Sequence, residues 1–221
     1  MKFLGSPSSG SVAGQTFSRN RNGQYVRNRR APVQPRTVAQ LNTRSRQSTN
    51  AAAWRALTGT QQEGWASLGL GMTRTDSLGS SYKLTGFQAF CSINNVLAQA
   101  GDTLLSDAPS QVTPTGLATM TLTIAHGTPA FSVAYTATPL ATGTRLIIRA
   151  SPQRSAGRTF EGDYRVISVT AAAAASPANI LTAYQAKFGT PVAGRKIFVS
   201  ASTTISGFES VPFNAAAIVA A

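Results

Sequence analysis

The side chains with the clearest capacity for chemistry lie in one basic stretch, SRNRNGQYVRNRR, at residues 18–30. The stretch holds five arginines, three asparagines and no acidic residue. Arginine makes planar, bidentate contacts with phosphate or carboxylate, and it also lies buried in protein interfaces. We therefore predict that this stretch and its flanks contact neighbouring subunits or nucleic acid. The candidate contact residues are Phe17, Arg19, Arg21, Tyr25, Arg27, Arg29, Arg30 and Arg36.

The positive charge of the chain is concentrated at its N-terminal end. The 221 residues carry a formal net charge of +13. The first 62 residues contain ten basic side chains and no acidic one, whereas the rest contains ten basic and seven acidic side chains. This distribution is typical of a basic arm attached to a nearly neutral body. The hydrophobic content of 42% is ample for a core in that body.

Residues suited to catalysis or metal binding are few. His126 is the single histidine and Cys91 the single cysteine, so a multi-histidine or cysteine-rich zinc site is excluded. A serine or threonine nucleophile needs a base and an orienting group, and one histidine leaves little room for that arrangement. No glycine-rich segment ends in the Gly-Lys-Ser or Gly-Lys-Thr of a phosphate-binding loop. The acidic pair Glu161 and Asp163 is more typical of a solvated loop than of a weak calcium site. We expect a non-enzymatic protein with no cofactor, no metal and no small-molecule substrate.

The sequence also indicates the compartment. Cys91 lies in an apolar helical pattern and is expected to be a small core residue, and a lone cysteine fits a reducing compartment. The apolar run in the opening MKFLGSPSSG is too short to form a signal peptide. The best uncharged run, residues 166–186, is interrupted by Ser, Thr, Pro and Asn and does not suit a bilayer. We expect a protein made in the cytoplasm with no membrane partner.

The basic stretch is expected to form a β-hairpin. Asn22-Gly23 is the strongest short-range signal for a two-residue turn, because both residues tolerate positive φ. This turn would pair Arg21 with Gln24, Arg19 with Val26, and Phe17 with Asn28. One face would then carry Phe17, Arg19, Arg21, Gln24 and Val26, and the other Ser18, Asn20, Tyr25, Arg27 and Arg29. Neither face is apolar enough to fold alone, so the hairpin needs a partner.

Three capping-box patterns, in which a Thr is followed three residues later by Gln or Glu, predict three helix starts. They lie at Thr37, Thr60 and Thr85. The first helix should end near Leu57, with Val38 and Leu41 among its apolar positions, and the third should end at Gly101. Trp54 and Trp65 are expected to be core residues that join two helices rather than base-stacking platforms. The segment 68–82 is expected to be a loop.

The pattern changes from residue 107 onward to short, β-branched, partly alternating segments. Strands are expected within residues 119–126, 131–137, 144–151, 164–170 and 195–202. A short helix is expected from Ser176 and Pro177 to Phe188, ended by Gly189. The apolar tail PFNAAAIVAA would complete an edge strand or dock on a neighbouring subunit. Strands at this spacing indicate an antiparallel β-sandwich of immunoglobulin or fibronectin type III character.

The expected fold class is therefore α+β, in three parts. Residues 1–36 form the basic arm with its hairpin, residues 37–106 a small helical unit, and residues 107–221 the β-sandwich domain.

Several motifs in order resemble a group of uncharacterised virion structural proteins of tailed phages. They are Gly10-Ser-Val-Ala-Gly14, TFSRNRNGQYVRNRRAPVQPRT, AAAWRALTGTQQEGW and LTGFQAFCSINN. The resemblance covers roughly the first 105 residues well and the β-rich half loosely. It implies a basic arm, Trp-containing helices and a β-rich C-terminal half. It also implies a location in the virion, after synthesis in the host cytoplasm.

Two functions follow as expectations. The first is a non-enzymatic virion structural protein, capsid-decorating, minor capsid or tail component, that assembles through the arm with copies of itself and other virion proteins. The alternative is a packaging or architectural protein whose arm neutralises the phosphates of nucleic acid. A solvated, disordered basic tail is the third interpretation of the arm. Salt separates the first two, because phosphate contacts weaken steeply as salt rises.

Overall fold

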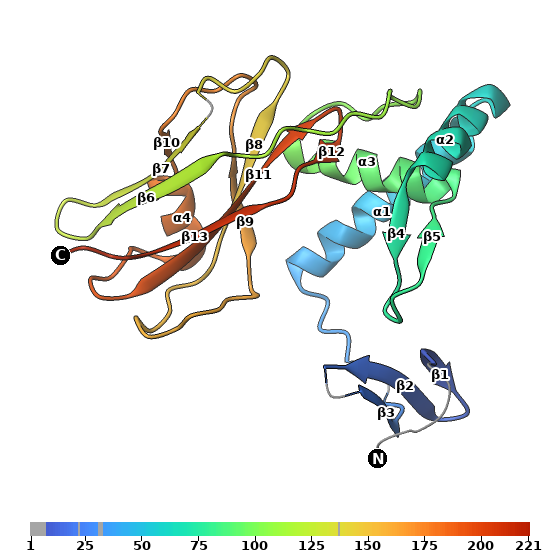
Figure 1. Cartoon of the computed structure of the whole chain (residues 1–221), viewed down its shortest axis with the longest axis horizontal. Helices are drawn as coiled ribbons and strands as arrows, with labels where there is room; N and C mark the ends of the chain where they lie inside the picture. Colours follow the sequence, from blue (N-terminus) through green and yellow to red (C-terminus); the bar gives the residue numbers. More distant parts are fainter. Residues whose placement is uncertain (1–7, 22, 31–32, 137) are drawn as a thin grey trace. The chain divides into compact units, whose positions relative to one another are not determined.

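The computed structural model describes residues 8–21, 23–30, 33–136 and 138–221. It shows an α+β chain with several antiparallel sheets, which confirms the fold class at that level (Figure 1). The chain divides into two compact units, one reaching Ser92 and including Leu105–Ser110, the other made of Ile93–Leu104 and Gln111–Ala221. The division falls within a helix. The three-part division at residues 36 and 106 stays a prediction.

The first unit contains helices α1 (Val38–Ala56) and α2 (Gly59–Gly71) and the start of α3 (Gly86–Ala100). The predicted capping boxes at Thr37 and Thr85 are present, each with both of its reciprocal hydrogen bonds. The predicted start at Thr60 is wrong. Thr58 caps α2 instead, with Gln61 as its partner, because the same Thr-x-x-Gln pattern occurs two residues earlier.

An aromatic cluster holds these helices together. Trp65 is fully buried, its ring meets Phe90 edge-on at 5.2 Å between centroids, and its Nε1 donates to the Ser106 carbonyl at 2.8 Å. Trp54 packs edge-on against Phe87 and Phe90. The prediction that the tryptophans are core residues is therefore confirmed for Trp65, whereas Trp54 packs on the same cluster but is only half-buried.

Residues 68–82 are not the expected loop. Helix α2 continues to Gly71, and β4 (Thr73–Thr75) and β5 (Ser81–Lys83) form a short antiparallel hairpin. The Asp76 carboxylate closes this hairpin by accepting hydrogen bonds from the backbone of Leu78 and Ser80. Strands of three residues are too short to show a period in the sequence, which is why the prediction missed them.

The second unit contains two antiparallel sheets. One has the order β10-β7-β6 and the other β12-β11-β8-β9, with β13 also paired to β11. Besides the end of α3, this unit contains β6 (Thr119–Ala125), β7 (Ala130–Thr136), β8 (Arg145–Ala150), β9 (Arg165–Val169), β10 (Ala178–Asn179), α4 (Leu181–Phe188), β11 (Lys196–Ile205), β12 (Phe208–Glu209) and β13 (Phe213–Ile218). All five predicted strands are present. The tail forms β13, which confirms the edge-strand expectation.

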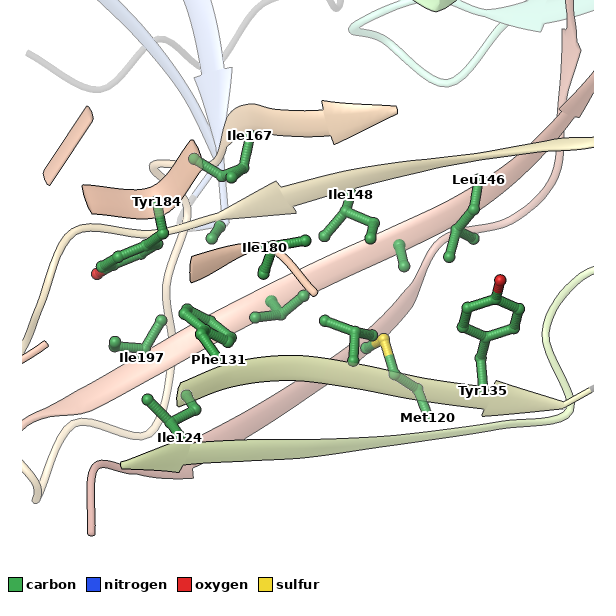
Figure 2. Packing of buried hydrophobic residues seen from close by; sticks show 14 of the residues in the cluster. Met120, Ile124, Phe131, Tyr135, Leu146, Ile148, Ile167, Ile180, Tyr184 and Ile197 are labelled. Carbon is green, nitrogen blue, oxygen red and sulfur yellow. The ribbon is translucent and has the colours of Figure 1, made fainter. Parts of the chain in front are cut away.

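Both sheets and α4 contribute to one hydrophobic core (Figure 2). Alternate residues of β7, namely Phe131, Val133 and Tyr135, are buried, as the period of a strand with one covered face requires. Tyr184 of α4 is also buried, stacks obliquely on Phe131 and donates its hydroxyl to the Ser151 carbonyl at 3.1 Å. This helix therefore supplies part of the core rather than merely connecting strands.

Two features of this unit differ from the sequence expectation. The helix predicted to begin at Ser176 and Pro177 begins at Leu181, because Ala178 and Asn179 pair with β7 and the Ser176 hydroxyl accepts from the Tyr135 amide. In addition, the two sheets are joined at one edge. The amide of Ala220 donates to Ile124 and its carbonyl accepts from His126, both at 3.0 Å, so the end of the chain bridges β13 and β6.

Candidate functional site

The basic stretch forms a small antiparallel sheet in the order β1-β2-β3 (Figure 1). Its strands are β1 (Gly10–Val12), β2 (Gln15–Asn20) and β3 (Gly23–Asn28). The predicted hairpin between β2 and β3 is present. Strand β1, which pairs with β2, was not predicted, because three residues rich in Gly and Ser carry no strand signal. We refer to β1–β3 as the arm sheet.

The predicted register of the hairpin is wrong. Phe17 pairs with Val26 and Arg19 with Gln24, so Asn20 and Gly23 are the last paired residues before the turn. Asn22, the first residue of the predicted turn, lies outside the described residues. Gly23 has φ of +109°, so it still supplies a positive φ, but as the first residue of β3. The Asn-Gly signal therefore located the turn but not the register of the two strands.

The corrected register keeps the paired residues on the two predicted faces of the hairpin, but Arg21, predicted on the first face, lies in the turn. The partner of each β2 residue moves by two positions, and a shift of two keeps every side chain on its side of a sheet. Phe17, Arg19, Gln24 and Val26 therefore share one face. Thr16, Ser18, Tyr25 and Arg27 share the opposite face. The strand period alone thus predicted which side chains act together, although it did not predict their partners.

The structure places the candidate contact residues as follows. Phe17 and Arg19 lie on β2, Tyr25 and Arg27 on β3, Arg21 in the turn, Arg29 and Arg30 just after β3, and Arg36 directly before the cap of α1. The six arginines are exposed, and Phe17 and Tyr25 are half-buried. Seven of the eight are thus brought onto or beside one sheet. Arg36 stands apart, at the start of the helical region.

Strand β3 presents an open backbone edge. The Arg29 amide donates to the Gly14 carbonyl at 2.7 Å, which makes this pair a hydrogen-bonded one. Because hydrogen-bonded and non-bonded pairs alternate in an antiparallel ladder, the N–H and C=O groups of Gln24, Val26 and Asn28 point away from β2. No described strand pairs with that side of β3. Such an edge is a template for another strand. The sequence pattern did not predict this open edge.

The described part of residues 8–49 contains the three strands of the arm sheet and the start of α1 but no core. In the part of the chain that the structure describes, no residue before Asn50 is buried. Apolar side chains are instead exposed along this region, at Val12, Val33, Val38 and Leu41. Val38 and Leu41, predicted as apolar positions of the first helix, have 74% and 48% of their surface accessible. We use the name arm region for residues 8–49.

The arginines of the arm region also lack carboxylate partners. All ion pairs among the described residues lie between residues 102 and 209. In the arm region, the contact of Arg44 with the Gln34 side chain at 2.6 Å is a hydrogen bond to a neutral group. The positive charge of this region is therefore not neutralised by any described acidic residue of the chain.

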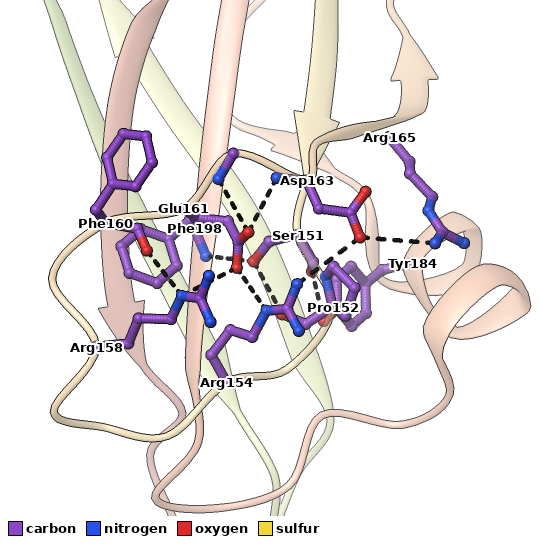
Figure 3. Close-up of polar contacts among 11 residues, drawn as sticks. Ser151, Pro152, Arg154, Arg158, Phe160, Glu161, Asp163, Arg165, Tyr184 and Phe198 are labelled. Atoms are coloured by element: carbon purple, nitrogen blue, oxygen red, sulfur yellow. Dashed lines mark hydrogen bonds and ion pairs between the residues drawn. The ribbon is translucent and has the colours of Figure 1, made fainter. Parts of the chain in front are cut away.

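A second polar cluster lies in the connection between β8 and β9 (Figure 3). Glu161 has a side chain only 2% exposed, and its carboxylate accepts from Arg154 Nε at 2.5 Å. It also accepts from the backbone amides of Gly162 and Asp163, both at 2.9 Å, and pairs with Arg158 at 3.4 Å. Asp163 lies between Arg154 and Arg165 at 3.7 and 3.6 Å.

The electrostatics of this cluster favour a structural role. The hydrogen bond from Arg154, followed by those from the backbone, lowers the pKa of Glu161 to about 2. A carboxylate whose acceptor positions are occupied in this way braces a loop rather than transferring protons. The prediction that Glu161 lies in a solvated loop is therefore wrong. The signal that sequence reasoning overlooked was the presence of three arginines, Arg154, Arg158 and Arg165, around these two acids.

The remaining candidate groups have structural contacts. His126 Nδ1 lies 2.7 Å from the Pro191 carbonyl. Cys91 is buried, and burial raises the pKa of its thiol. Among the residues described, no group of three or more His, Cys, Asp or Glu side chains could hold a metal ion. Within the same residues, every helix is too short or too polar to cross a membrane.

Comparison of the chain with protein-family models, with curated proteins and with solved structures found no match.

Proposed function

We propose that this chain is a non-enzymatic virion structural protein of a tailed phage, a capsid-decorating, minor capsid or tail component, that assembles through its arm region. The observation that carries the proposal is the absence of any buried residue before Asn50 in the described chain. Small isolated sheets are marginal in water, and a helix without an apolar covered face gains little from packing. A neighbouring subunit supplies the missing surface.

The open edge of β3 gives this assembly its physical basis. An added strand satisfies the outward backbone groups of Gln24, Val26 and Asn28, and this form of recognition yields a large contact from a thin element. The exposed Val12, Val33 and Val38 add apolar area that a neighbour would remove from water. Partners in this proposal are further copies of the chain and other virion proteins.

The second unit is the body that the arm region tethers. Its two antiparallel sheets around one core support our proposal of an immunoglobulin-like or fibronectin type III-like sandwich. In the proposed particle this body faces outward or spaces neighbouring subunits. Interstrand backbone contacts measured by NMR that differ from these pairings would overturn the proposed sandwich class without affecting the assembly role.

The first experiment compares the full chain with a variant that lacks residues 1–36. Both are treated with nuclease and measured by size exclusion with light scattering at high salt, where phosphate contacts are weak. We expect the full chain to form defined oligomers and the truncated chain to be monomeric. If both are monomers under these conditions, the assembly role is wrong.

A single substitution tests the edge itself. Asn28→Pro removes an outward N–H and leaves the ladder between β2 and β3 intact, because the amide of residue 28 points away from β2. Asn28→Ala is the matched control, since it removes the same side chain and keeps the amide. We expect the proline variant to lose oligomers and the alanine variant to keep them. Equal behaviour of the two variants would show that β3 does not pair with a partner strand.

A further inference from the structure

The face of the arm sheet opposite Phe17 and Val26 has a composition of its own. It carries Tyr25 and Arg27 from β3 and Thr16 and Ser18 from β2, and Arg29 continues the alternation just beyond β3. We call these five residues the basic face. All of them have hydrogen-bond donors in their side chains, and none is acidic.

The geometry of the basic face suits a repeating anionic ligand. Alternate residues of a strand are about 6.6–6.8 Å apart on one side, so Tyr25, Arg27 and Arg29 form a row with an aromatic ring at one end and two guanidinium groups after it. Thr16 pairs with Arg27 and Ser18 with Tyr25 across the sheet, which places a hydroxyl beside each of these side chains. Arginine, serine, threonine and tyrosine side chains are common donors to phosphate oxygens in nucleic-acid complexes.

We infer that the basic face binds the phosphate backbone of nucleic acid without reading its sequence. Arg27 and Arg29 contact phosphates, the Ser18 hydroxyl adds a donor, and the Tyr25 ring stacks on a base, which favours single strands. The Thr16 hydroxyl already hydrogen-bonds the Ser11 hydroxyl at 2.9 Å. Charge complementarity supports this ligand, because the first 62 residues hold ten basic side chains and no acidic one. The inference goes beyond the assembly role, since it uses the side chains of one face rather than the backbone edge of β3.

The test measures binding of a fluorescent 30-nucleotide oligothymidine by anisotropy over a range of salt concentrations. The variant R27Q/R29Q removes two charges from the basic face, and R19Q/R21Q removes the same two charges from the opposite face and the turn. We expect R27Q/R29Q to weaken binding at least tenfold and to reduce the log–log salt slope by about 1.4, or about 0.7 for each lost phosphate contact. R19Q/R21Q should weaken binding less than threefold.

Four further measurements complete the test. Tyr25→Leu should weaken oligothymidine binding about tenfold through lost stacking, and Asn28→Pro should leave it unchanged. Equal losses in R27Q/R29Q and R19Q/R21Q would overturn the inference, because binding would then follow total charge rather than one face. Binding to phosphatidylserine vesicles with no binding to the oligonucleotide would also overturn it. Light scattering of R27Q/R29Q at high salt reports assembly separately, so failure of this inference is distinguishable from failure of the assembly role.

Discussion

The arm region and the second unit, which we call the β-rich unit, use arginine in opposite ways. In the β-rich unit, Arg145 pairs with Asp102 at 2.6 Å, Arg149 with Glu209 at 2.7 Å, and Arg154 with the buried Glu161 at 2.5 Å. In the arm region, the described arginines are exposed and have no carboxylate partner within the chain. The same residue type therefore forms ion pairs in one region, whereas in the other its charge is not neutralised and Arg19 and Arg44 donate only to neutral groups.

The two regions differ in the same way in their apolar side chains. The β-rich unit buries Phe131, Ile148 and Tyr184 in one core, whereas the arm region exposes Val12, Val33 and Val38. The described chain therefore leaves both the charge and the apolar side chains of the arm region uncovered, which supports the proposal that a partner covers them.

The largest expected effect on stability comes from the core of the β-rich unit. Phe131→Ala removes a ring that is 1% exposed, and such changes cost about 3–5 kcal/mol of unfolding free energy. Urea unfolding followed by circular dichroism should show this loss. Val38→Ala in the arm region should change the unfolding free energy by less than about 0.5 kcal/mol. A comparable loss in both variants would break the distinction between the two regions.

The second-largest expected effect is in the connection between β8 and β9, where Arg154 contacts Glu161. Arg154→Met removes the group that contributes most to the low pKa of Glu161, so the pKa of that carboxyl should rise and the melting temperature of the β-rich unit should fall. Carbon-detected NMR titration of the glutamate carboxyls measures the first change and calorimetry the second. Arg27→Met serves as the control and should alter neither. An unchanged Glu161 pKa in Arg154→Met would mean that the backbone amides alone hold the carboxylate.

The same carboxylate predicts a pH dependence. Because its folded-state pKa of about 2 lies below the ordinary value of 4.5, the unfolded chain binds more protons between these two values. The stabilisation is therefore fully present above about pH 4.5 and is lost as the pH falls toward 2. Melting temperatures from pH 2.5 to pH 6 should rise less steeply in Glu161→Gln than in the original chain. A parallel profile in Glu161→Gln would assign the acid sensitivity to other groups.

The smallest expected effect is in the arm region itself. Replacing Arg19, Arg21, Arg27 and Arg29 together with Gln should change the unfolding transition of the helical region by less than about 0.5 kcal/mol. Tryptophan fluorescence reports this transition, since both tryptophans, Trp54 and Trp65, lie in the first unit. A larger loss would show that these arginines stabilise the chain rather than contact a partner.

Features set by neighbouring residues in the chain were predictable. The capping boxes at Thr37 and Thr85, the five strands of the β-rich unit, the helix end at Gly189 and the two faces of the arm hairpin all follow from spacing within a few residues. Each depends on local backbone geometry, which side chains three or four positions apart determine directly.

Features set by which segments meet in space required the tertiary structure. Glu161 is buried because its loop folds back on Arg154, and β3 has an open edge because no other described strand reaches it. The hairpin register, the short strands β4 and β5, and the bridge between Ala220 and β6 are likewise decided by pairing rather than by pattern.

The sequence by itself therefore determined where charge and apolar side chains occur and which of them share a face. The tertiary structure decided which of those groups are satisfied within the chain. The physical reason is that a period in the sequence records the geometry of one element. The partner of a charge or of a strand edge depends on which elements meet in space.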